Sequence, residues 1–388
     1  MLYIIIVMSD KIPAPFKCAR IPQVYFSIPV PDALAFLLAK TGYRTLIISG
    51  ETSWGHLAIE AELEKSLSPH IKSLAYERFS GEPSPEIVNT MVSRHRGAID
   101  AVVAVGGGSV IDAGKAVAAM LCENDPVERF LEGVGDLVPS GKRTAFYACP
   151  TTAGTGSEAT KNAVLSNVGP SGYKKSLRHD NYIPDAAIID PPLSLSCPLE
   201  TTIASGLDAL SQLLEAFTSS KANALTDCYA LEGIALGYEG LTNAAKEPEN
   251  ISHREKLALA AFYSGIALAN AGLGAVHGIA GPIGAYSSIP HGLICGKLLS
   301  PVFLETITRD AAQLLSPRMK KIENKTGSDY KAIFAALSDL SAKIPSFDSF
   351  GLSDEIISKA VAGFSNKNAL VPLDIDMITD ILRKCRSI

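Results

Sequence analysis

Three glycines and a serine separate an apolar run from an alanine-rich run in the first third of the chain. Residues 101–105 read AVVAV, the glycines occupy 106–108, and residues 110–120 read VIDAGKAVAAM. A continuous valine-rich run is typical of a strand buried on both faces of a parallel sheet. Glycines leave backbone N–H groups accessible where the strand ends, and the start of the next helix adds unpaired N–H groups and a positive dipole. The pattern predicts a phosphate-binding turn, with a tight turn that binds no ligand as the simpler alternative.

Two residues also predict where the helix after the glycines begins. Ser109 and Asp112 fit a capping box of the form S-x-x-D, which places the helix start at Val110.

A second polar, glycine-containing element follows another apolar run. Residues 144–149 read TAFYAC and lead into CPTTAGTGSE at 149–158. Threonine and serine hydroxyls together with accessible N–H groups suit a sugar, a phosphate or a carboxamide. A polar loop that only caps the next helix is the alternative. Two such loops after neighbouring strands favour a dinucleotide over a single anion.

A third set of residues could bind a metal ion. Asp208 and Gln212 are four residues apart in a helical pattern, so their side chains project from one helix face. His277 and His291 lie in one apolar segment and each precedes a glycine. A carboxylate and imidazoles from facing helices form divalent metal sites in helical domains. Each histidine alone could instead be a buried imidazole bonded to backbone.

The elements that position these residues follow an alternating pattern up to about residue 190. Alternation of apolar runs with helical patterns predicts βαβ units and a parallel sheet covered by helices. The expected strands are 45–49, 73–79, 101–105, 144–149 and 188–189, and the expected helices lie around 57–66 and 85–96.

Strand signals nearly vanish after Pro192, and alanine- and leucine-rich segments with helical spacing replace them. The expected helices are 200–219, 225–244, 253–271 and 328–343. We therefore expect an α/β dinucleotide-binding domain at 1–191 and an all-α metal and substrate domain at 192–388. The cleft between them is the expected site.

Composition limits the possible functions. With 47% hydrophobic and 19% charged residues, the 388-residue chain is not disordered. A net charge of −5 argues against a nucleic-acid partner. Seven cysteines without a C-x-x-C pair indicate reduced, mostly buried thiols and a cytoplasmic location. The apolar N-terminal run is too short to span a bilayer, so no membrane partner is expected.

Four motifs together identify a family. GGGSVIDAGKA, PTTAGTGSE, ASGLDALSQLLEAF and HGIAGPIGAYSSIPHG occur in this order and at the spacing of the iron-containing (group III) alcohol dehydrogenases. The chain resembles that family over nearly its whole length. Glycerol dehydrogenase and dehydroquinate synthase are less similar, because Ser109 and Lys115 favour the alcohol dehydrogenase pattern. The resemblance implies a Rossmann-like α/β domain followed by a helical domain, the dehydroquinate synthase-like superfold.

The resemblance also implies a metal site with two departures from the family pattern. Asp208, His277 and His291 match three metal ligands, and Gln212 stands where the family usually has a histidine ligand. An amide oxygen is a weaker donor than imidazole for Fe²⁺ or Zn²⁺. Gly281 stands where many members carry a proton-relay histidine, so a water network is expected there instead.

Cofactor contacts follow from the same resemblance. The pyrophosphate and the nicotinamide ribose would lie along Gly107, Gly108, Ser109 and Asp112. The nicotinamide side would be lined by Thr151, Thr152 and Thr155, and Lys174 would reach the ribose.

The choice of cofactor depends on the end of the first expected strand. Gly50 stands where NAD-dependent members tend to have an aspartate, which leaves room for a 2′-phosphate that Thr52 and Ser53 could contact. A match shifted by one residue would give Glu51 the acidic role, which would favour NAD. We expect NADP rather than NAD.

The expected function is metal-assisted hydride transfer between NAD(P)(H) and a small alcohol, aldehyde or ketone, in a homodimer or larger homo-oligomer. Three alternatives stay open: a metal-independent carbonyl reductase of the same family, a non-redox synthase-like enzyme of the same superfold, and a degenerate member that binds cofactor without turnover, which Gln212 and Gly281 together suggest.

Overall fold

The N-terminal half of the protein is built on a six-stranded, fully parallel sheet. The structure, a computed structural model, describes residues 15–39, 41–51 and 59–387; the expected roles of Thr52 and Ser53 fall outside these ranges. The strand order is β1-β8-β5-β4-β2-β3. The strands are β1 (Gln23–Phe26), β2 (Arg44–Gly50), β3 (Ser73–Phe79), β4 (Ala101–Gly106), β5 (Ala145–Pro150) and β8 (Ala186–Ile189). The parallel sheet expected from the alternating pattern is confirmed.

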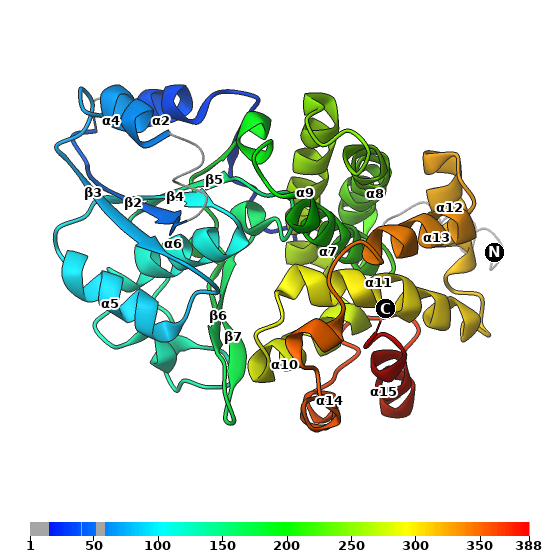
Figure 1. The fold of residues 1–388 in the computed structure, drawn as a ribbon. Helices are drawn as coiled ribbons and strands as arrows, with labels where there is room; N and C mark the ends of the chain where they lie inside the picture. The colour runs from blue at the N-terminus through cyan, green and yellow to red at the C-terminus, as the bar shows by residue number, and fades with distance from the viewer. Residues whose placement is uncertain (1–14, 40, 52–58, 388) are drawn as a thin grey trace, which may run out of the picture.

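Helices cover both faces of this sheet (Figure 1). The helices of this half are α2 (Val30–Leu38), α4 (Ile59–Leu67), α5 (Pro85–His95) and α6 (Gly108–Met120). Along β4, Val103 and Val105 pack in one cluster with α2 and α4, whereas Val102 and Ala104 pack in another with α5 and α6. The uninterrupted apolar run of β4 therefore reflects burial on both faces.

The strand order reverses between β2 and β4. From β2 the chain continues outward to β3, and it then returns to the other side of β2 to add β4, β5 and β8. Such a reversal opens a crevice at the carboxyl ends of the strands, where open α/β sheets bind ligands. Both glycine-containing loops, after β4 and after β5, begin at this edge.

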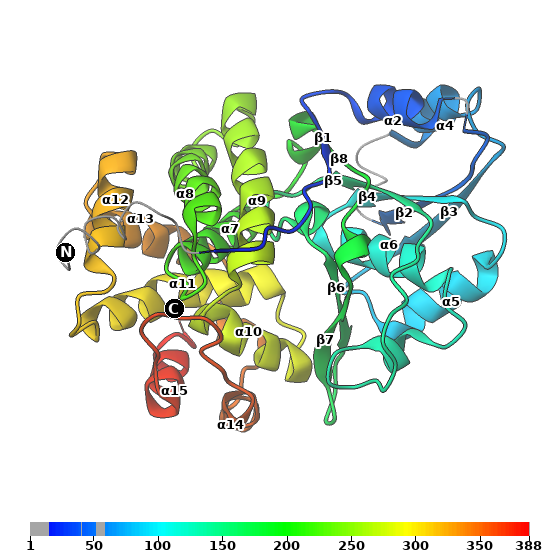
Figure 2. The ribbon, with the colours of Figure 1, turned by 180° about the vertical axis from the view of Figure 1, so that it is seen from behind.

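A two-stranded antiparallel hairpin, which the sequence did not lead us to expect, lies between the sheet and the helices (Figure 2). Its strands are β6 (Asn162–Asn167) and β7 (Tyr173–Arg178). β6 packs on α6 and β7 packs on α10. Their sequences, NAVLSN and YKKSLR, carry too few apolar residues to give a clear strand signal.

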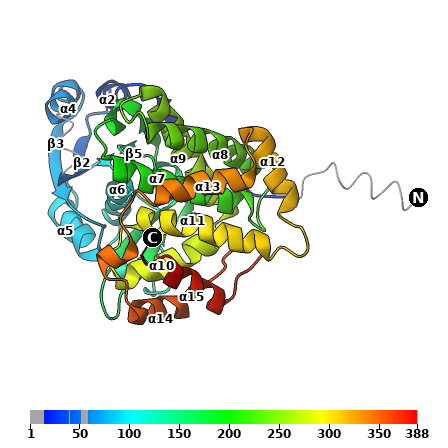
Figure 3. The same cartoon turned by 45° about the vertical axis from the view of Figure 1, so that its right-hand side comes forward.

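The C-terminal half is helical in the described residues, with α7, α8, α9 and α11 packed together (Figure 3). The helices are α7 (Leu199–Phe217), α8 (Ala224–Ala244), α9 (Ile251–Ala271), α10 (Ala275–Tyr286), α11 (His291–Thr308), α12 (Ser316–Thr326), α13 (Tyr330–Ser341), α14 (Asp354–Ala362) and α15 (Ile375–Lys384). Short 3₁₀ helices occur in both halves of the chain. Those before α7 are η1 (Val127–Phe130), η2 (Ser157–Ala159), η3 (Asp180–Tyr182) and η4 (Pro191–Ser194), and η5 (Phe347–Phe350) lies between α13 and α14. Within the described ranges, no single helix has both the length and the hydropathy to cross a membrane, although the bent pair α9 and α10 would meet both criteria jointly.

Two expectations from the sequence were wrong. The capping box does not form: α6 begins at Gly108 after an extended Gly107, without a side-chain cap. Asp112 instead accepts a hydrogen bond from Val164 N at 3.0 Å. The helix begins early because a glycine takes the N-cap position, so Ser109 is already inside it.

The thiols are all free, as expected, but they are not mostly buried. Cys149, Cys295 and Cys385 are buried, and Cys18, Cys122 and Cys228 are exposed.

A buried ammonium group joins α6 to the second loop. Lys115 is 0% exposed, and its Nζ donates to Ser157 O, Thr160 Oγ1 and Asn162 O at 2.8, 2.9 and 2.8 Å. Three oxygen acceptors satisfy all three N–H donors of the ammonium group, which a buried charge requires. The loop after β5 is thereby held against the helix that follows β4.

Glu158, in the same loop, makes the stability of the fold depend on pH. Burial raises the pKa of Glu158 to about 7, and the attraction of Lys115 only partly opposes this. The unfolded chain loses this proton near its ordinary pKa of 4.5, whereas the folded chain keeps it up to about pH 7. The contribution of this group is therefore fully present below pH 4.5 and is lost as pH rises through 7.

We expect Glu158→Gln to remove this slope. The free energy of unfolding of the wild type should fall relative to the variant by on the order of 2–3 kcal/mol between about pH 5 and pH 8. Urea unfolding at several pH values measures this difference, with the exposed Glu62→Gln as the matched control. Parallel pH profiles for wild type and Glu158→Gln would contradict the assignment.

Candidate active site

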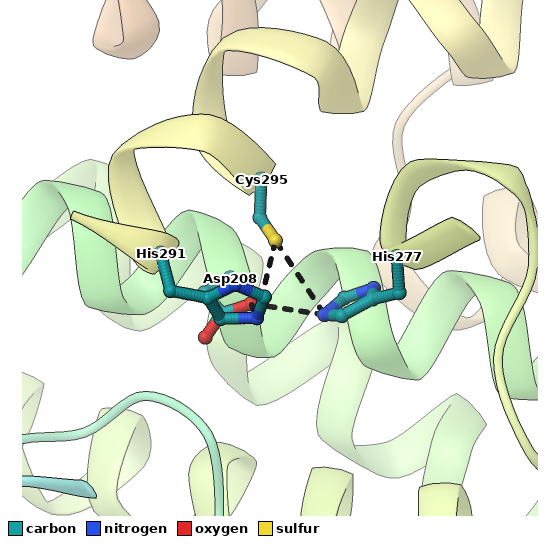
Figure 4. Close-up of side chains that lie close together, drawn as sticks. All are labelled: Asp208, His277, His291 and Cys295. Atoms are coloured by element: carbon teal, nitrogen blue, oxygen red, sulfur yellow. Dashed lines mark hydrogen bonds and ion pairs between the residues drawn. The ribbon is translucent and has the colours of Figure 1, made fainter. Parts of the chain in front are cut away.

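Four potential metal ligands from three helices meet at one point in the helical half (Figure 4). Asp208 comes from the middle of α7, His277 from the first turn of α10, and His291 and Cys295 from the first two turns of α11. One ligand atom from each lies within 4.8 Å of the others. The structure therefore brings together Asp208, His277 and His291, and it adds a thiol.

The spacing of these atoms suits a tetrahedral cation. Asp208 Oδ1 lies 3.2 Å from His277 Nε2 and 4.0 Å from His291 Nε2. Cys295 Sγ lies 3.5 Å from His277 Nε2 and 3.7 Å from His291 Nε2. Ordinary zinc–ligand bond lengths give tetrahedral edges of about 3.3 Å between nitrogen and oxygen and about 3.6 Å between sulfur and nitrogen. Three of the four distances match these edges closely, so the residues fit a divalent metal.

Glu215 orients the imidazole of His277. The carboxylate is 3% exposed, and its Oε2 lies 2.7 Å from His277 Nδ1. Its Oε1 accepts a hydrogen bond from Val276 N at 2.7 Å. With Nδ1 engaged, Nε2 faces Asp208, which is the arrangement that metal-binding histidines usually have. Glu215 lies two turns after Asp208 on the same helix face, a signal that the sequence analysis missed.

The charges of the cluster favour a cation. Burial lowers the pKa of His277, but Cys295, Glu215 and Asp208 outweigh it and raise that pKa well above its ordinary value. Burial raises the pKa of Asp208, but His291 and His277 outweigh it and lower that pKa. Burial lowers the pKa of His291 to about 3. Burial also raises the pKa of Cys295 to about 12, so metal binding must displace protons from His277 and the thiol.

Gln212 and Gly281 line a cavity beside the cluster, together with His277, but contribute little to the cluster itself. Gln212 Oε1 accepts a hydrogen bond from Ser264 Oγ at 2.9 Å, which engages the oxygen expected to reach the metal. A Cβ on Gly281 would meet nothing within 4 Å, so this position leaves open space in the cavity wall. Cys295 is the fourth donor that the sequence analysis missed. Its signal was available, because it follows His291 by one helical turn.

Two large cavities meet beside this cluster. One, of about 590 Å³, is lined by His277, Gln212 and Gly281 among others, and the second, of about 610 Å³, by Asp208 and Thr152. Residues that line both are Glu82, Gly108, Ser109, Thr155 and His291.

The expected cofactor residues fall into three groups. Gly108, Ser109, Asp112, Thr152, Thr155 and Lys174 line one or both cavities. Gly107 borders them, since a Cβ there would lie 3.2 Å from Thr152 Oγ1. Thr151 lines neither; it is 4% exposed, and its N–H bonds Gly106 O.

Lys174 is paired within the cleft. Its Nζ lies 2.5 Å from Glu82 Oε1, and Ser166 Oγ donates to Glu82 Oε2 at 2.5 Å. Burial raises the pKa of Glu82, but Lys174 outweighs this and lowers it. Glu82 was absent from the sequence analysis because no motif marks it.

Gly50 ends β2 beside the glycine turn. The register pairs Ser49 with Val105, so Gly50 and Gly106 lie at the same edge of the sheet. Gly50 is buried and Glu51 is exposed.

Comparisons with known proteins match most of the chain. Residues 22–191 match a model of the iron-containing alcohol dehydrogenases, and residues 202–372 match the C-terminal part of the Fe-containing alcohol dehydrogenase family. The chain is 33% identical over 333 residues to the "Probable alcohol dehydrogenase EutG" of Escherichia coli, covering 84% of this chain and 82% of that protein. It is 30% identical over 307 residues to alcohol dehydrogenase 4 of Saccharomyces cerevisiae, covering 77% and 76%.

A solved structure is similar over nearly the whole length. Sulfoacetaldehyde reductase from Bifidobacterium kashiwanohense, crystallised with NAD⁺, superimposes with a TM-score of 0.83 at 27% identity, covering 96% of this chain and 99% of that one. The matched family models, the curated relatives and the shared fold lead to one conclusion: this chain belongs to the iron-containing alcohol dehydrogenase family.

Proposed function

We propose that the protein transfers a hydride between a nicotinamide dinucleotide and a small alcohol or aldehyde, assisted by a divalent cation. The observation that carries this proposal is the position of His291. It belongs to the cluster of Asp208, His277, His291 and Cys295, called the metal-type cluster below. It also lines both cavities together with Gly108 and Ser109 of the glycine turn. A substrate beside His291 would therefore lie within reach of a nicotinamide whose pyrophosphate occupies that turn.

The metal would be held by Asp208, His277, His291 and Cys295, with Gln212 as a weak or water-bridged partner. When bound, the cation supplies Lewis acidity to an alcohol or carbonyl oxygen. Mixed imidazole, carboxylate and thiolate donors suit zinc as well as iron, and we propose Zn²⁺ or Fe²⁺. Glu215 fixes the orientation of His277, and His291 leaves the cluster open to the two cavities.

The cofactor would lie along the carboxyl edge of the sheet. Gly107, Gly108 and Ser109 would contact its pyrophosphate. Thr152 and Thr155 would line its nicotinamide side. Lys174, which Glu82 holds in position, would contact its ribose. The bound dinucleotide carries the hydride. The NAD⁺ complex of the sulfoacetaldehyde reductase supports a dinucleotide here. The small residue Gly50 favours NADP over NAD, because no carboxylate stands at its position. The division into domains at 191/192, the homo-oligomeric state and the cytoplasmic location stay predictions.

The first test is turnover itself. Protein supplied with Zn²⁺ or Fe²⁺ should oxidise NADPH faster than NADH when short-chain aldehydes are added, and chelation should lower kcat more than about tenfold because the Lewis acid is lost. Absorbance of the reduced nicotinamide measures both effects. Full activity after chelation would instead establish a metal-independent carbonyl reductase, and cofactor binding without any turnover would establish a degenerate member.

The glycine turn can be tested at the position where an added side chain disturbs its packing least. A Cβ on Gly106 would lie 2.6 Å from Val110, whereas one on Gly107 would lie 3.2 Å from the hydroxyl of Thr152. We expect Gly107→Val to weaken dinucleotide binding at least about tenfold, because its methyl groups would occupy the phosphate space. Calorimetric titration measures the affinity, and thermal unfolding controls for folding. Unchanged affinity for both NAD and NADP would rule out this binding mode.

The thiol can be tested by spectroscopy. Cobalt-substituted wild type should show a near-ultraviolet sulfur-to-cobalt charge-transfer band, which Cys295→Ser should lose together with roughly tenfold or more in metal affinity. Cys149→Ser, which removes another buried thiol, should keep the band. If cobalt binds to the wild type without the band, Cys295 is not a ligand, and Gln212 or water takes the fourth position.

A further inference from the structure

Two lysines without an acidic partner line the cavity that holds the metal-type cluster. Lys221 and Lys367 border the 590 Å³ cavity together with His277 and Gln212. Neither side chain forms a hydrogen bond or an ion pair within the described part of the chain. The other cations of this cavity are each paired: Lys161 with Asp180 at 2.6 Å, Lys174 with Glu82 at 2.5 Å and Arg178 with Glu132 at 3.4 Å.

The backbone joins the two segments that carry these lysines. Ser219 and Ala369 form an isolated antiparallel bridge, and Ser220 N donates to Asn368 O at 2.8 Å. Lys221 lies two residues after Ser219 and Lys367 two residues before Ala369, so the bridge places the two lysines on adjoining loops. The two loops are also tied to the loop before α10, because Asn368 N donates to Leu273 O at 3.0 Å.

The conformation of Lys367 is unusual for its residue type. Its φ angle is +47°, in the left-handed region that residues with a side chain rarely adopt. Backbone strain of this kind persists where the surrounding structure enforces it, and it concentrates at ligand sites. The strained backbone directs a lysine to the wall of the cavity, although an asparagine or glycine would adopt this φ more easily.

Both lysines are accessible to an anion, since Lys221 and Lys367 are exposed residues that line the cavity. At Lys367, burial lowers the pKa and the negative charges of Glu215 and Cys295 oppose this, so its ammonium group lies within electrostatic range of those residues. A bound anion would give the two ammonium groups the partner that the described residues do not supply.

We propose that Lys221 and Lys367 bind an anionic group on the substrate. The substrate class is a short aldehyde or alcohol that carries a carboxylate, sulfonate or phosphate at the end remote from its reacting carbon. This inference rests on the proposed function, since it places the reacting carbon beside His277 and His291. Gly108 and Ser109 of the glycine turn line this cavity too, so a phosphate of the dinucleotide is the competing anion, and the cofactor affinity of Lys367→Met separates the two.

A pair of aldehydes matched in shape tests the proposal. Succinic semialdehyde and isocaproaldehyde differ in that a carboxylate replaces an isopropyl group. With metal and reduced cofactor present, kcat/KM should favour the anionic aldehyde by roughly tenfold or more. Lys367→Met should remove most of this preference, leave kcat/KM for the neutral aldehyde within about twofold, and leave cofactor affinity unchanged. Lys175→Met, on the exposed side of β7, is the control and should change neither.

A binding measurement separates this proposal from the proposed function. Propanesulfonate carries the anion but no carbonyl, so calorimetric titration reports the lysine site even in a protein that turns over neither aldehyde. Binding to wild type that weakens at least about fivefold in Lys367→Met supports the proposal. Equal kcat/KM for the two aldehydes, an equal loss for both in Lys367→Met, or propanesulfonate binding that the substitution leaves unchanged would overturn it. Absence of turnover with either aldehyde would count against the proposed function alone.

Discussion

The carboxylate of Glu215 is the contact on which the geometry of the site depends. It joins α7 to the first turn of α10 by accepting from Val276 N and by engaging His277 Nδ1. The approach is so close that a Cβ on Gly274 would lie 3.0 Å from Glu215 Oε1. Because Glu215 and Asp208 both project from α7, one helix fixes both sides of the imidazole. Two buried carboxylates against one imidazolium leave an excess negative charge, which a divalent cation would neutralise.

The turn after β4 serves packing, and this role is compatible with the ligand binding proposed for its glycines. A Cβ on Gly106 would collide with Val110, and one on Gly108 would lie 2.4 Å from Thr155 Oγ1. The first glycine therefore allows the helix to pack closely on its strand, and the last allows the two polar loops to touch. Lys115 maintains that contact from inside, because its ammonium group bonds the backbone of the second loop. The surface proposed for the dinucleotide is a consequence of these close approaches.

The sequence predicted elements whose signal is local and missed those that depend on distant partners. Buried strands such as β4 and the helices α7 to α9 follow from apolar pattern, and the fold was predictable to that extent. The hairpin β6–β7 was not, because it is stabilised by packing on α6 and α10 rather than by its own composition. Asp208, His277 and His291 were predictable because motifs mark them. Cys295 and Glu215 carry helical spacing only, and spacing becomes meaningful once the helices that face each other are known.

The two lysines of the cavity could not be predicted by any of these arguments. Lys221 and Lys367 are 146 positions apart in the numbering and share no motif. They become neighbours because a short antiparallel bridge joins the loop after α7 to the loop after α14. That bridge starts from the end of α7, the helix that also carries Asp208 and Glu215. The bridge therefore ties both lysine-bearing loops to the helix that carries two residues of the site, and a limited range of separations between them would select substrates by length as well as by charge.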